Sequence, residues 1–209
     1  MATKQRALTV QNILDAKVSA FDFTGEWRDA FGTPQMGGIW FVYGGSGSGK
    51  TSFILALMKQ QASFVNKILF ESYEEGVASR ALQENIKRLG LISLNRKILI
   101  ADETLDAMFE RLDRRKSPDV VFIDSLEYSG FKNIKQITEM ERRYPKKTFV
   151  IIGQASGSRP RTELGESVLF MANQKIYIEG YRAFSRGRSF GPKKYYTIWE
   201  EEAAKYWDK

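Results

Sequence analysis

Short apolar runs alternate with segments of helical periodicity along most of the chain. The runs span four to six positions and are rich in β-branched and aromatic residues, whereas the intervening segments repeat apolar residues every three or four positions. Runs of this kind are typical of strands buried on both faces, so the pattern predicts an α/β fold with a mainly parallel sheet covered by helices on both sides. Strands are expected at residues 38–43, 67–70, 97–101, 120–124 and 148–153, with helices at 52–61, 77–89, 105–114 and 134–143.

The two ends of the chain depart from this alternation. Residues 9–17 have an amphipathic helical pattern with Thr9 as N-cap, and residues 21–36 mix aromatic residues, Gly and Pro as an irregular segment does. Residues 174–179 and 194–200 predict an antiparallel ribbon at the edge of the sheet, and helix-like residues follow from position 201. No repeat or low-complexity linker interrupts the sequence, so one domain is expected, with a lead-in over residues 1–37, a core over 38–172 and a ribbon and tail over 173–209.

Composition narrows the chemistry that is available. The 209 residues include no cysteine and no histidine, which excludes disulfides, thiolate metal sites and the usual general base. Catalysis must then rest on carboxylates, Lys, Arg, backbone amides and a metal ion held by oxygen ligands. No apolar run is long enough to span a membrane and the first residues lack a signal-peptide core, so a cytoplasmic protein is expected. The net charge of +7 favours polyanionic partners, although many proteins this basic bind no nucleic acid.

The strongest motif follows the first strand of the core. Its sequence, GGSGSGKT, fits the pattern G-x-x-x-x-G-K-[ST], with an apolar strand before it and a helix after it. Glycines allow successive backbone N–H groups to turn inward around an anion at the start of a helix. The motif therefore predicts binding of a nucleoside triphosphate, ATP with Mg²⁺, in which Lys50 contacts the β- and γ-phosphates and the Thr51 hydroxyl binds the metal ion. The residues expected to contact the nucleotide are Gly44, Gly45, Ser46, Gly47, Ser48, Gly49, Lys50, Thr51 and Ser52.

Acidic residues follow two of the other strands. Asp124 ends the apolar run 120–124, and in a parallel sheet this position lies beside the phosphate-binding loop, where it would support Mg²⁺ through a water. The alternative is an aspartate that caps the next segment. Glu71, Glu74 and Glu75 follow the strand after the loop's helix, and one of them is expected to orient the attacking water because Ser125, not a glutamate, follows Asp124. Glu74 is the preferred candidate and Glu75 the second.

Gln154 follows the strand at residues 148–153. A neutral amide at this position would bind the γ-phosphate by hydrogen bonding and transmit its loss to the following loop. The alternative is an ordinary polar strand end.

In these blocks and their order, the sequence resembles the RecA-like P-loop ATPase core, in particular the branch of RadA, KaiC and the DnaB-type helicases. The matching blocks are GGSGSGKT, LFESYEEG, VVFIDS and VIIGQ, and TGEWRDAFGTPQMGGIWFVYG is similar to the lead-in of that family. The resemblance covers roughly residues 32–200, although only these blocks are specific. It implies that Glu74 activates water, that Asp124 is the metal-associated aspartate and that Gln154 is the sensor of the γ-phosphate.

Two features depart from the family. Tyr73 precedes the acidic pair, where a smaller residue is common in the RadA branch, so the choice between Glu74 and Glu75 stays open. A zinc module, a helix-hairpin-helix module and a protease-like tail are all missing, and a bare ATPase core is therefore expected.

The resemblance also assigns roles to three basic segments. Residues 126–133 and 155–168 occupy the positions of the family's two DNA-contacting loops, with Tyr128, Phe131 and Lys132 in the first and Arg159 and Arg161 in the second. Aromatic rings would stack on bases and cations would contact phosphates, whereas the alternative for each segment is an ordinary solvated loop.

A third basic segment, RGRSFGP, begins at Arg186 and resembles the turn through which subunits of this family reach a neighbour's γ-phosphate. Arg186 and Arg188 would then act in trans, and hydrolysis would depend on assembly into a ring or filament. The alternative is a basic hairpin tip that touches nucleic acid or nothing.

Taken with the resemblance, the sequence predicts an oligomeric, Mg²⁺-dependent ATPase that releases ADP, binds single-stranded DNA and acts in DNA recombination, repair or replication. A KaiC-like signalling ATPase with protein partners and no DNA binding is the first alternative. A small-molecule kinase is the second, although Gln154 and the basic tail ribbon argue against it.

Overall fold

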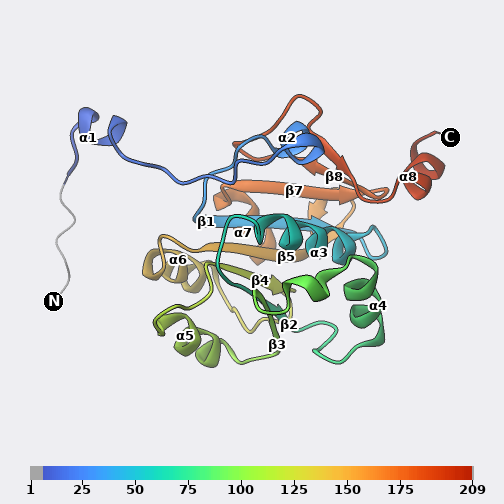
Figure 1. Cartoon of the computed structure of the whole chain (residues 1–209), viewed down its shortest axis with the longest axis horizontal. Coiled ribbons are helices and arrows are strands. Elements are labelled where there is room, and N and C mark those ends of the chain that lie inside the picture. Colours follow the sequence, from blue (N-terminus) through green and yellow to red (C-terminus); the bar gives the residue numbers. More distant parts are fainter. Residues whose placement is uncertain (1–6, 209) are drawn as a thin grey trace.

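The computed structural model describes residues 7–208 and contains one nine-stranded sheet. The strands follow the order β3-β2-β4-β5-β1-β7-β8-β9, and a short strand, β6, pairs with the end of β5. All contacts from β3 to β7 along this order are parallel, whereas β6, β8 and β9 pair antiparallel (Figure 1). The strands are β1 (Gly38–Gly44), β2 (Ile68–Ser72), β3 (Ile98–Ala101), β4 (Val120–Asp124), β5 (Thr148–Ser156), β6 (Arg159–Pro160), β7 (Gln174–Glu179), β8 (Arg182–Ser185) and β9 (Tyr195–Thr197). The α/β class, the mainly parallel sheet and the antiparallel extension are confirmed.

Helices cover both faces of this sheet. The helical elements are α1 (Val10–Leu14), α2 (Gly25–Phe31), α3 (Lys50–Gln61), α4 (Arg80–Arg88), a 3₁₀ turn (Leu91–Leu94), α5 (Leu105–Asp113), α6 (Ile134–Arg143), α7 (Glu163–Met171) and α8 (Glu200–Trp207). Side chains of α2, α3 and α4 belong to one buried apolar cluster, and those of α5, α6 and α7 belong to a second. Within the described residues, no helix is long and apolar enough to cross a membrane.

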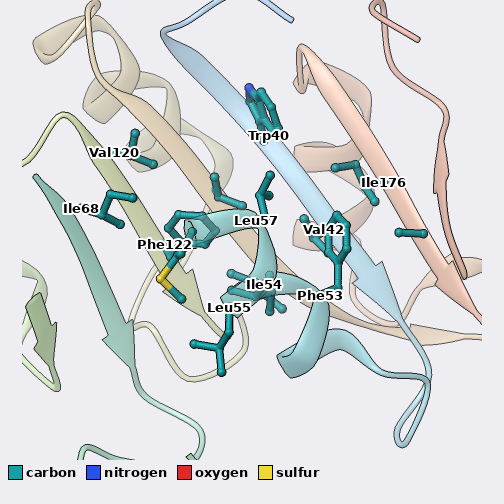
Figure 2. Close-up of a cluster of buried hydrophobic side chains, with 14 of the residues drawn as sticks. Trp40, Val42, Phe53, Ile54, Leu55, Leu57, Ile68, Val120, Phe122 and Ile176 are labelled. Atoms are coloured by element: carbon teal, nitrogen blue, oxygen red, sulfur yellow. The ribbon is translucent and has the colours of Figure 1, made fainter. Parts of the chain in front are cut away.

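Successive side chains of β1 point alternately into the two apolar clusters. Trp40 and Val42 point into the first cluster with α3 (Figure 2), whereas Ile39, Phe41 and Tyr43 point into the second. All five side chains are almost fully buried. A strand buried on both faces reads as a continuous apolar run, which is why the sequence identifies β1 so clearly.

Two helices lie where irregular structure was expected. The segment 21–36 contains α2, whose Ala30 and Phe31 are buried, and the expected DNA-contacting loop at 155–168 is a short β5–β6 hairpin followed by the start of α7. Thr162 caps α7 by accepting a hydrogen bond from the backbone N–H of Gly165. This cap and the apolar residues behind it favour a packed helix over an irregular loop at the end of the segment.

Candidate functional site

The phosphate-binding loop lies between β1 and α3, near the middle of the sheet. Gly44 ends β1 and pairs in register with Gln154 of β5 on one side and Ile178 of β7 on the other. A Cβ atom on Gly44 would lie 2.5 Å from the Ile178 carbonyl oxygen, so only glycine fits. Gly47 and Gly49 have φ values of +71° and +98°, which L-residues with side chains rarely adopt. These glycines give the loop the turned backbone that an anion nest requires.

Lys50 is the first residue of α3, and its ammonium group turns back over the loop. Its Nζ donates to the carbonyl oxygens of Gly44 and Gly45 at 3.0 and 2.8 Å. Burial lowers the Lys50 pKa, while the charges of Glu74, Asp124 and Glu127 act to raise it. The free N–H groups at the start of α3 and the Lys50 ammonium thus form one positively polarised site.

Asp124 ends β4 and faces this site from a buried position. Only 7% of its surface is exposed. Burial and, after it, the nearby charges of Glu74 and Glu75 together raise the Asp124 pKa to about 7, although Lys50 acts to lower it. A bound divalent cation would offset this concentration of negative charge.

Two backbone hydrogen bonds place Glu74 beside Asp124. The backbone N–H groups of Tyr73 and Glu74 donate to the Asp124 carbonyl oxygen at 2.7 and 3.1 Å. The Glu75 carboxylate accepts from the Ser79 hydroxyl at 3.1 Å, at the N-cap of α4. The exposed Glu74 carboxylate has no hydrogen bond to another described residue, and its charge acts on both Lys50 and Asp124. Within residues 7–208 it is therefore the freer of the two carboxylates.

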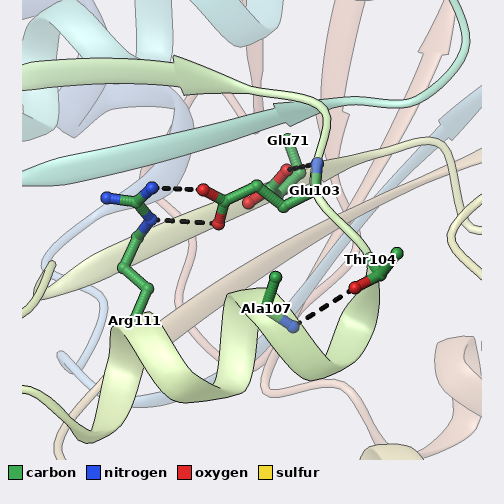
Figure 3. A network of polar contacts seen from close by, with 5 residues as sticks. All are labelled: Glu71, Glu103, Thr104, Ala107 and Arg111. Carbon is green, nitrogen blue, oxygen red and sulfur yellow. Dashed lines mark hydrogen bonds and ion pairs between the residues drawn. The ribbon is translucent and has the colours of Figure 1, made fainter.

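Glu71 lies outside this site. Its side chain is fully buried on the sheet face that α5 covers, where it accepts from the Glu103 backbone N–H at 3.1 Å while the Glu103 carboxylate pairs with Arg111 (Figure 3). Burial raises the Glu71 pKa to about 7. The pleat of β2 turns Glu71 away from the loop, which removes it as a candidate for orienting water.

The donors at this edge suit Mg²⁺. Thr51 follows Lys50 in the first turn of α3 and supplies a hydroxyl, and Asp124 supplies a buried carboxylate. No three acidic side chains in the described part of the chain converge as a dedicated protein cation site would require. Mg²⁺ commonly binds through one or two protein oxygens together with phosphates and water, so this donor set fits Mg²⁺ that enters with a nucleotide.

Gln154 lies opposite Gly44 and connects the loop to the β5–β6 hairpin. Its side-chain oxygen accepts from Arg161 Nη1 at 2.9 Å, and its backbone N–H donates to Glu127 Oε1 at 3.0 Å. The other Glu127 oxygen is buried and has no hydrogen-bond partner among the described residues. Glu127 was missed in the sequence because its only signal there is an acid three positions after Asp124.

A hollow of about 260 Å³ adjoins the outer side of the loop. Ser52 borders it and accepts a hydrogen bond from Arg88 Nη2 at 2.9 Å. The hollow is also lined by Tyr181, Ile198 and Trp199 of the C-terminal ribbon. These residues are far from the phosphate-binding loop in sequence, and no local motif predicts their role. Arg80 pairs with Glu84 on the exposed side of α4 and does not line the hollow.

The two basic loops differ from the prediction in what they expose. Phe131 packs into the second apolar cluster and is only 7% exposed, so stacking of its ring on a base is excluded in this structure. Tyr128 and Lys132 are exposed, as is Arg159 at the tip of the β5–β6 hairpin. The apolar contacts of Phe131 with the core decide its orientation.

Arg186 and Arg188 follow β8, at the start of the turn that leads to β9. The backbone N–H of Arg188 donates to Asn173, just before β7, whereas the phosphate-binding loop follows the opposite end of the parallel strand β1. The Arg186 guanidinium lies over the Tyr177 ring and donates to the Tyr43 hydroxyl at 3.1 Å. The exposed Arg188 thus lies at the sheet edge away from its own loop, and a role for it in hydrolysis requires a neighbouring copy.

Comparison with known proteins identifies the fold. No protein-family model and no curated protein sequence matches the chain. Its structure is similar to that of a KaiC-like protein from the hyperthermophilic archaeon Pyrococcus horikoshii OT3, with a TM-score of 0.60 and 18% identity over 86% of this chain and 97% of that one. It is also similar to the flagellar accessory protein FlaH from Methanocaldococcus jannaschii, with a TM-score of 0.58 and 15% identity over 87% and 92% of the two chains. The chain therefore has the RecA-like fold of P-loop ATPases, as the resemblance implied.

Proposed function

We propose that this protein is a Mg²⁺-dependent ATPase that hydrolyses ATP to ADP and phosphate. The observation that carries the proposal is the convergence of Lys50, Asp124 and Glu74 at the carboxyl edge of the sheet, where the charges of all three act on one another. A cation, a buried carboxylate and a freer carboxylate are the groups that phosphoryl transfer to water requires.

Each group then has a distinct part in hydrolysis. The loop amides and Lys50 hold the triphosphate and stabilise the charge that develops on the γ-phosphate. Thr51 and Asp124 would hold Mg²⁺, which when bound supplies further neutralisation of the phosphate oxygens. Glu74 accepts a hydrogen bond from the attacking water and aims it, and Gln154 bonds the γ-phosphate.

The hollow beside the loop supports a nucleoside rather than a bare polyphosphate as ligand. Tyr181 and Trp199 offer aromatic surface and Ile198 aliphatic surface next to Gly49 and Thr51. A purine base is planar and apolar on its faces, so it would gain by stacking there while its phosphates occupy the loop.

We further propose that turnover is coupled to single-stranded DNA. The hydrogen bond between Gln154 and Arg161 supports this coupling, because a Gln154 amide that turns towards a γ-phosphate releases Arg161. Arg161, Arg159 and Lys132 would then contact DNA phosphates, with the exposed Tyr128 in place of Phe131 for stacking. Recombination, repair or replication is the setting that such coupling fits.

Assembly into a ring or filament belongs to the same proposal. Arg188 is remote from its own phosphate-binding loop and is free to approach another. In addition, aliphatic side chains around α1 are exposed where this helix stands away from the body of the molecule (Figure 1), namely Leu8, Val10, Ile13, Leu14 and Val18. Exposed apolar surface of this kind is typical of protein contacts.

A KaiC-like signalling ATPase with protein partners is the second candidate. The buried Phe131 and the short β5–β6 hairpin favour it, since they leave less surface for gripping a strand than long mobile loops would. In this alternative Gln154 and Arg161 transmit the nucleotide state to a protein instead of DNA.

One experiment separates these candidates. Phosphate and ADP release would be measured with Mg²⁺-ATP, with and without a single-stranded oligonucleotide, for the wild type and for Arg159→Ala/Arg161→Ala. We expect hydrolysis without any acceptor molecule, stimulation by DNA and loss of that stimulation in the double variant. Hydrolysis that ignores DNA at low salt would favour the signalling ATPase, and phosphate transfer only to an added small molecule would indicate a kinase.

A further inference from the structure

A second basic surface lies at the amino ends of the parallel strands, opposite the phosphate-binding loop at their carboxyl ends. Two short connections form it, one from α5 to β4 and the other from α6 to β5. Val120 at the start of β4 pairs in register with Thr148 at the start of β5, so the two connections meet at the same edge. Lys147 Nζ joins them by donating to Ser117 Oγ at 2.8 Å and to the Pro118 carbonyl oxygen at 2.6 Å.

The cations that remain exposed there form what we call the basal patch: Arg114, Arg115, Lys116, Arg142 and Lys146. None of these five side chains has a hydrogen bond or ion pair to another residue within the described range of 7–208. Two hollows border the patch, one of about 480 Å³ lined by Lys146 and Lys17, and one of about 370 Å³ lined by Lys116 and Lys67, with Asp119 in both linings. The positive charge therefore extends over a continuous surface.

Local acids offset only part of this charge. The Asp113 carboxylate accepts from the Arg143 guanidinium and from the Tyr144 hydroxyl, and Asp119 accepts from the backbone N–H groups of Asn66 and Lys67. Both carboxylates are thus engaged with other groups. A favourable position at a helix C-terminus accounts for Arg142 in the last turn of α6 and for Arg114 at the C-cap of α5, but not for Arg115, Lys116 and Lys146.

Lys116 of the basal patch has an unusual backbone conformation. Its φ value is +62°, a conformation that Gly or Asn adopts with less strain. A lysine at this turn adds a charge to the patch at a cost in backbone energy.

We propose that the basal patch binds the phosphate backbone of nucleic acid, independently of sequence and of the nucleotide state. Phosphodiester groups suit several unpaired cations spread over two rigid connections. The exposed large apolar side chains include none from residues 111–119 or 142–147, so the two connections lack rings that could read bases. The exposed Val18 lines the first hollow, but one aliphatic side chain is a weak anchor for a membrane-binding surface. Binding there should accept duplex and single-stranded DNA alike.

This inference goes beyond the proposed function, because the patch and the phosphate-binding loop lie at opposite edges of the sheet. The proposed function and DNA binding at the basal patch can therefore be tested independently. Binding at the patch is expected to need neither Mg²⁺ nor ATP, whereas coupling through Gln154 and Arg161 needs both.

The test is fluorescence anisotropy with a labelled 20-base-pair duplex and the matching single strand at several salt concentrations. Arg115→Glu/Arg142→Glu would be compared with Lys87→Glu/Arg96→Glu, a control of equal charge change at exposed sites on and beyond α4. We expect the basal variant to bind both DNAs at least about tenfold more weakly at low salt and to lower the salt slope by about two, and the control to change affinity much less. ATP hydrolysis without DNA should stay at the wild-type value in both variants, and the thermal unfolding midpoint should fall by a similar small amount in both, because Arg142 and Lys87 each lie in the last turn of a helix.

Three results would overturn the proposal. Equal losses in the two variants would mean that only net charge matters, and wild-type affinity in the basal variant would place the DNA elsewhere. If DNA binding is unchanged while binding to vesicles of anionic phospholipid is lost, the patch faces a membrane instead.

Discussion

At the scale of single residues, Glu74 and Glu75 differ in what they contact. Glu75 is bonded to Ser79, whereas the Glu74 carboxylate acts on both Lys50 and Asp124. We therefore predict that Glu74→Gln keeps ATP binding but lowers the single-turnover rate of hydrolysis by about 10²- to 10⁴-fold, because the amide cannot accept the proton of the attacking water. Glu75→Gln is the matched control and should stay within a few fold of wild type. The reverse ranking would move the role to Glu75.

The raised pKa of the buried Glu71 carboxyl makes the stability of the fold depend on pH. Its pKa is raised by burial from 4.5 to about 7, so between these values the folded state holds a proton that the unfolded state has lost. The contribution of Glu71 to stability therefore falls as the pH rises from 4.5 to about 7, by an amount on the order of 3 kcal/mol or less. Above this window the contribution no longer changes with pH. Asp124 contributes a change of the same sign in wild type and variant alike, so it cancels in their comparison.

Glu71→Gln should therefore leave stability nearly unchanged at pH 5 and increase it at pH 8. Urea unfolding at the two pH values measures the difference. The glutamine oxygen can still accept from the Glu103 backbone N–H, so the variant tests the charge and not the hydrogen bond. A variant less stable than wild type at pH 8 would show that the carboxylate is needed in its charged form.

At the scale of secondary-structure elements, the strands were the most predictable part. β4 and α6 have the predicted bounds, and β1 extends one residue further, because buried parallel strands and strongly periodic helices leave unambiguous patterns. α4 begins at Arg80 and not at residue 77, since the Ser79 hydroxyl accepts from the Leu82 N–H and sets the helix start. β8 was missed because its four residues lie in a basic, glycine-containing stretch that shows no alternation.

The candidate site was predictable only where it is local in sequence. Gly44, Lys50 and Asp124 belong to short motifs that predict phosphate and metal binding. The structure places them together at the carboxyl ends of the parallel strands. Tyr181 and Trp199 reach the same edge only because β7 pairs with β1 and is followed by β8 and β9 in the sheet. Phe131 shows the opposite failure, since nothing in its loop sequence indicates that the ring is buried.

The C-terminal ribbon carries a prediction of its own. Trp199 is 52% exposed and lines the hollow beside Gly49 and Thr51. Its fluorescence should change when ATP binds, and Trp199→Ala should weaken ATP binding by roughly three- to tenfold, the worth of one aromatic stacking contact. Affinity for inorganic tripolyphosphate should not change, because that ligand has no base. Equal losses for both ligands would mean that Trp199 only supports the loop.

At the scale of the whole molecule, the proposed action of Arg188 in trans would make assembly a requirement for full activity. Arg188→Ala and Glu74→Gln subunits would each be nearly inactive alone. Mixed, they should recover phosphate release, because some interfaces pair an intact Glu74 with an intact Arg188 from the neighbour. Activity of the mixture no greater than the average of the two variants would exclude action in trans.

The account depends most on the triphosphate being held by the loop between β1 and α3. Titration calorimetry of Mg²⁺-ATP into wild type, Lys50→Ala and the surface control Lys87→Ala measures this directly. We predict binding to wild type and control with the same affinity, and an affinity lower by about 10- to 100-fold for Lys50→Ala, the worth of a charged hydrogen bond to phosphate. Unchanged affinity in Lys50→Ala, or no binding of ATP to the wild type, would contradict the account.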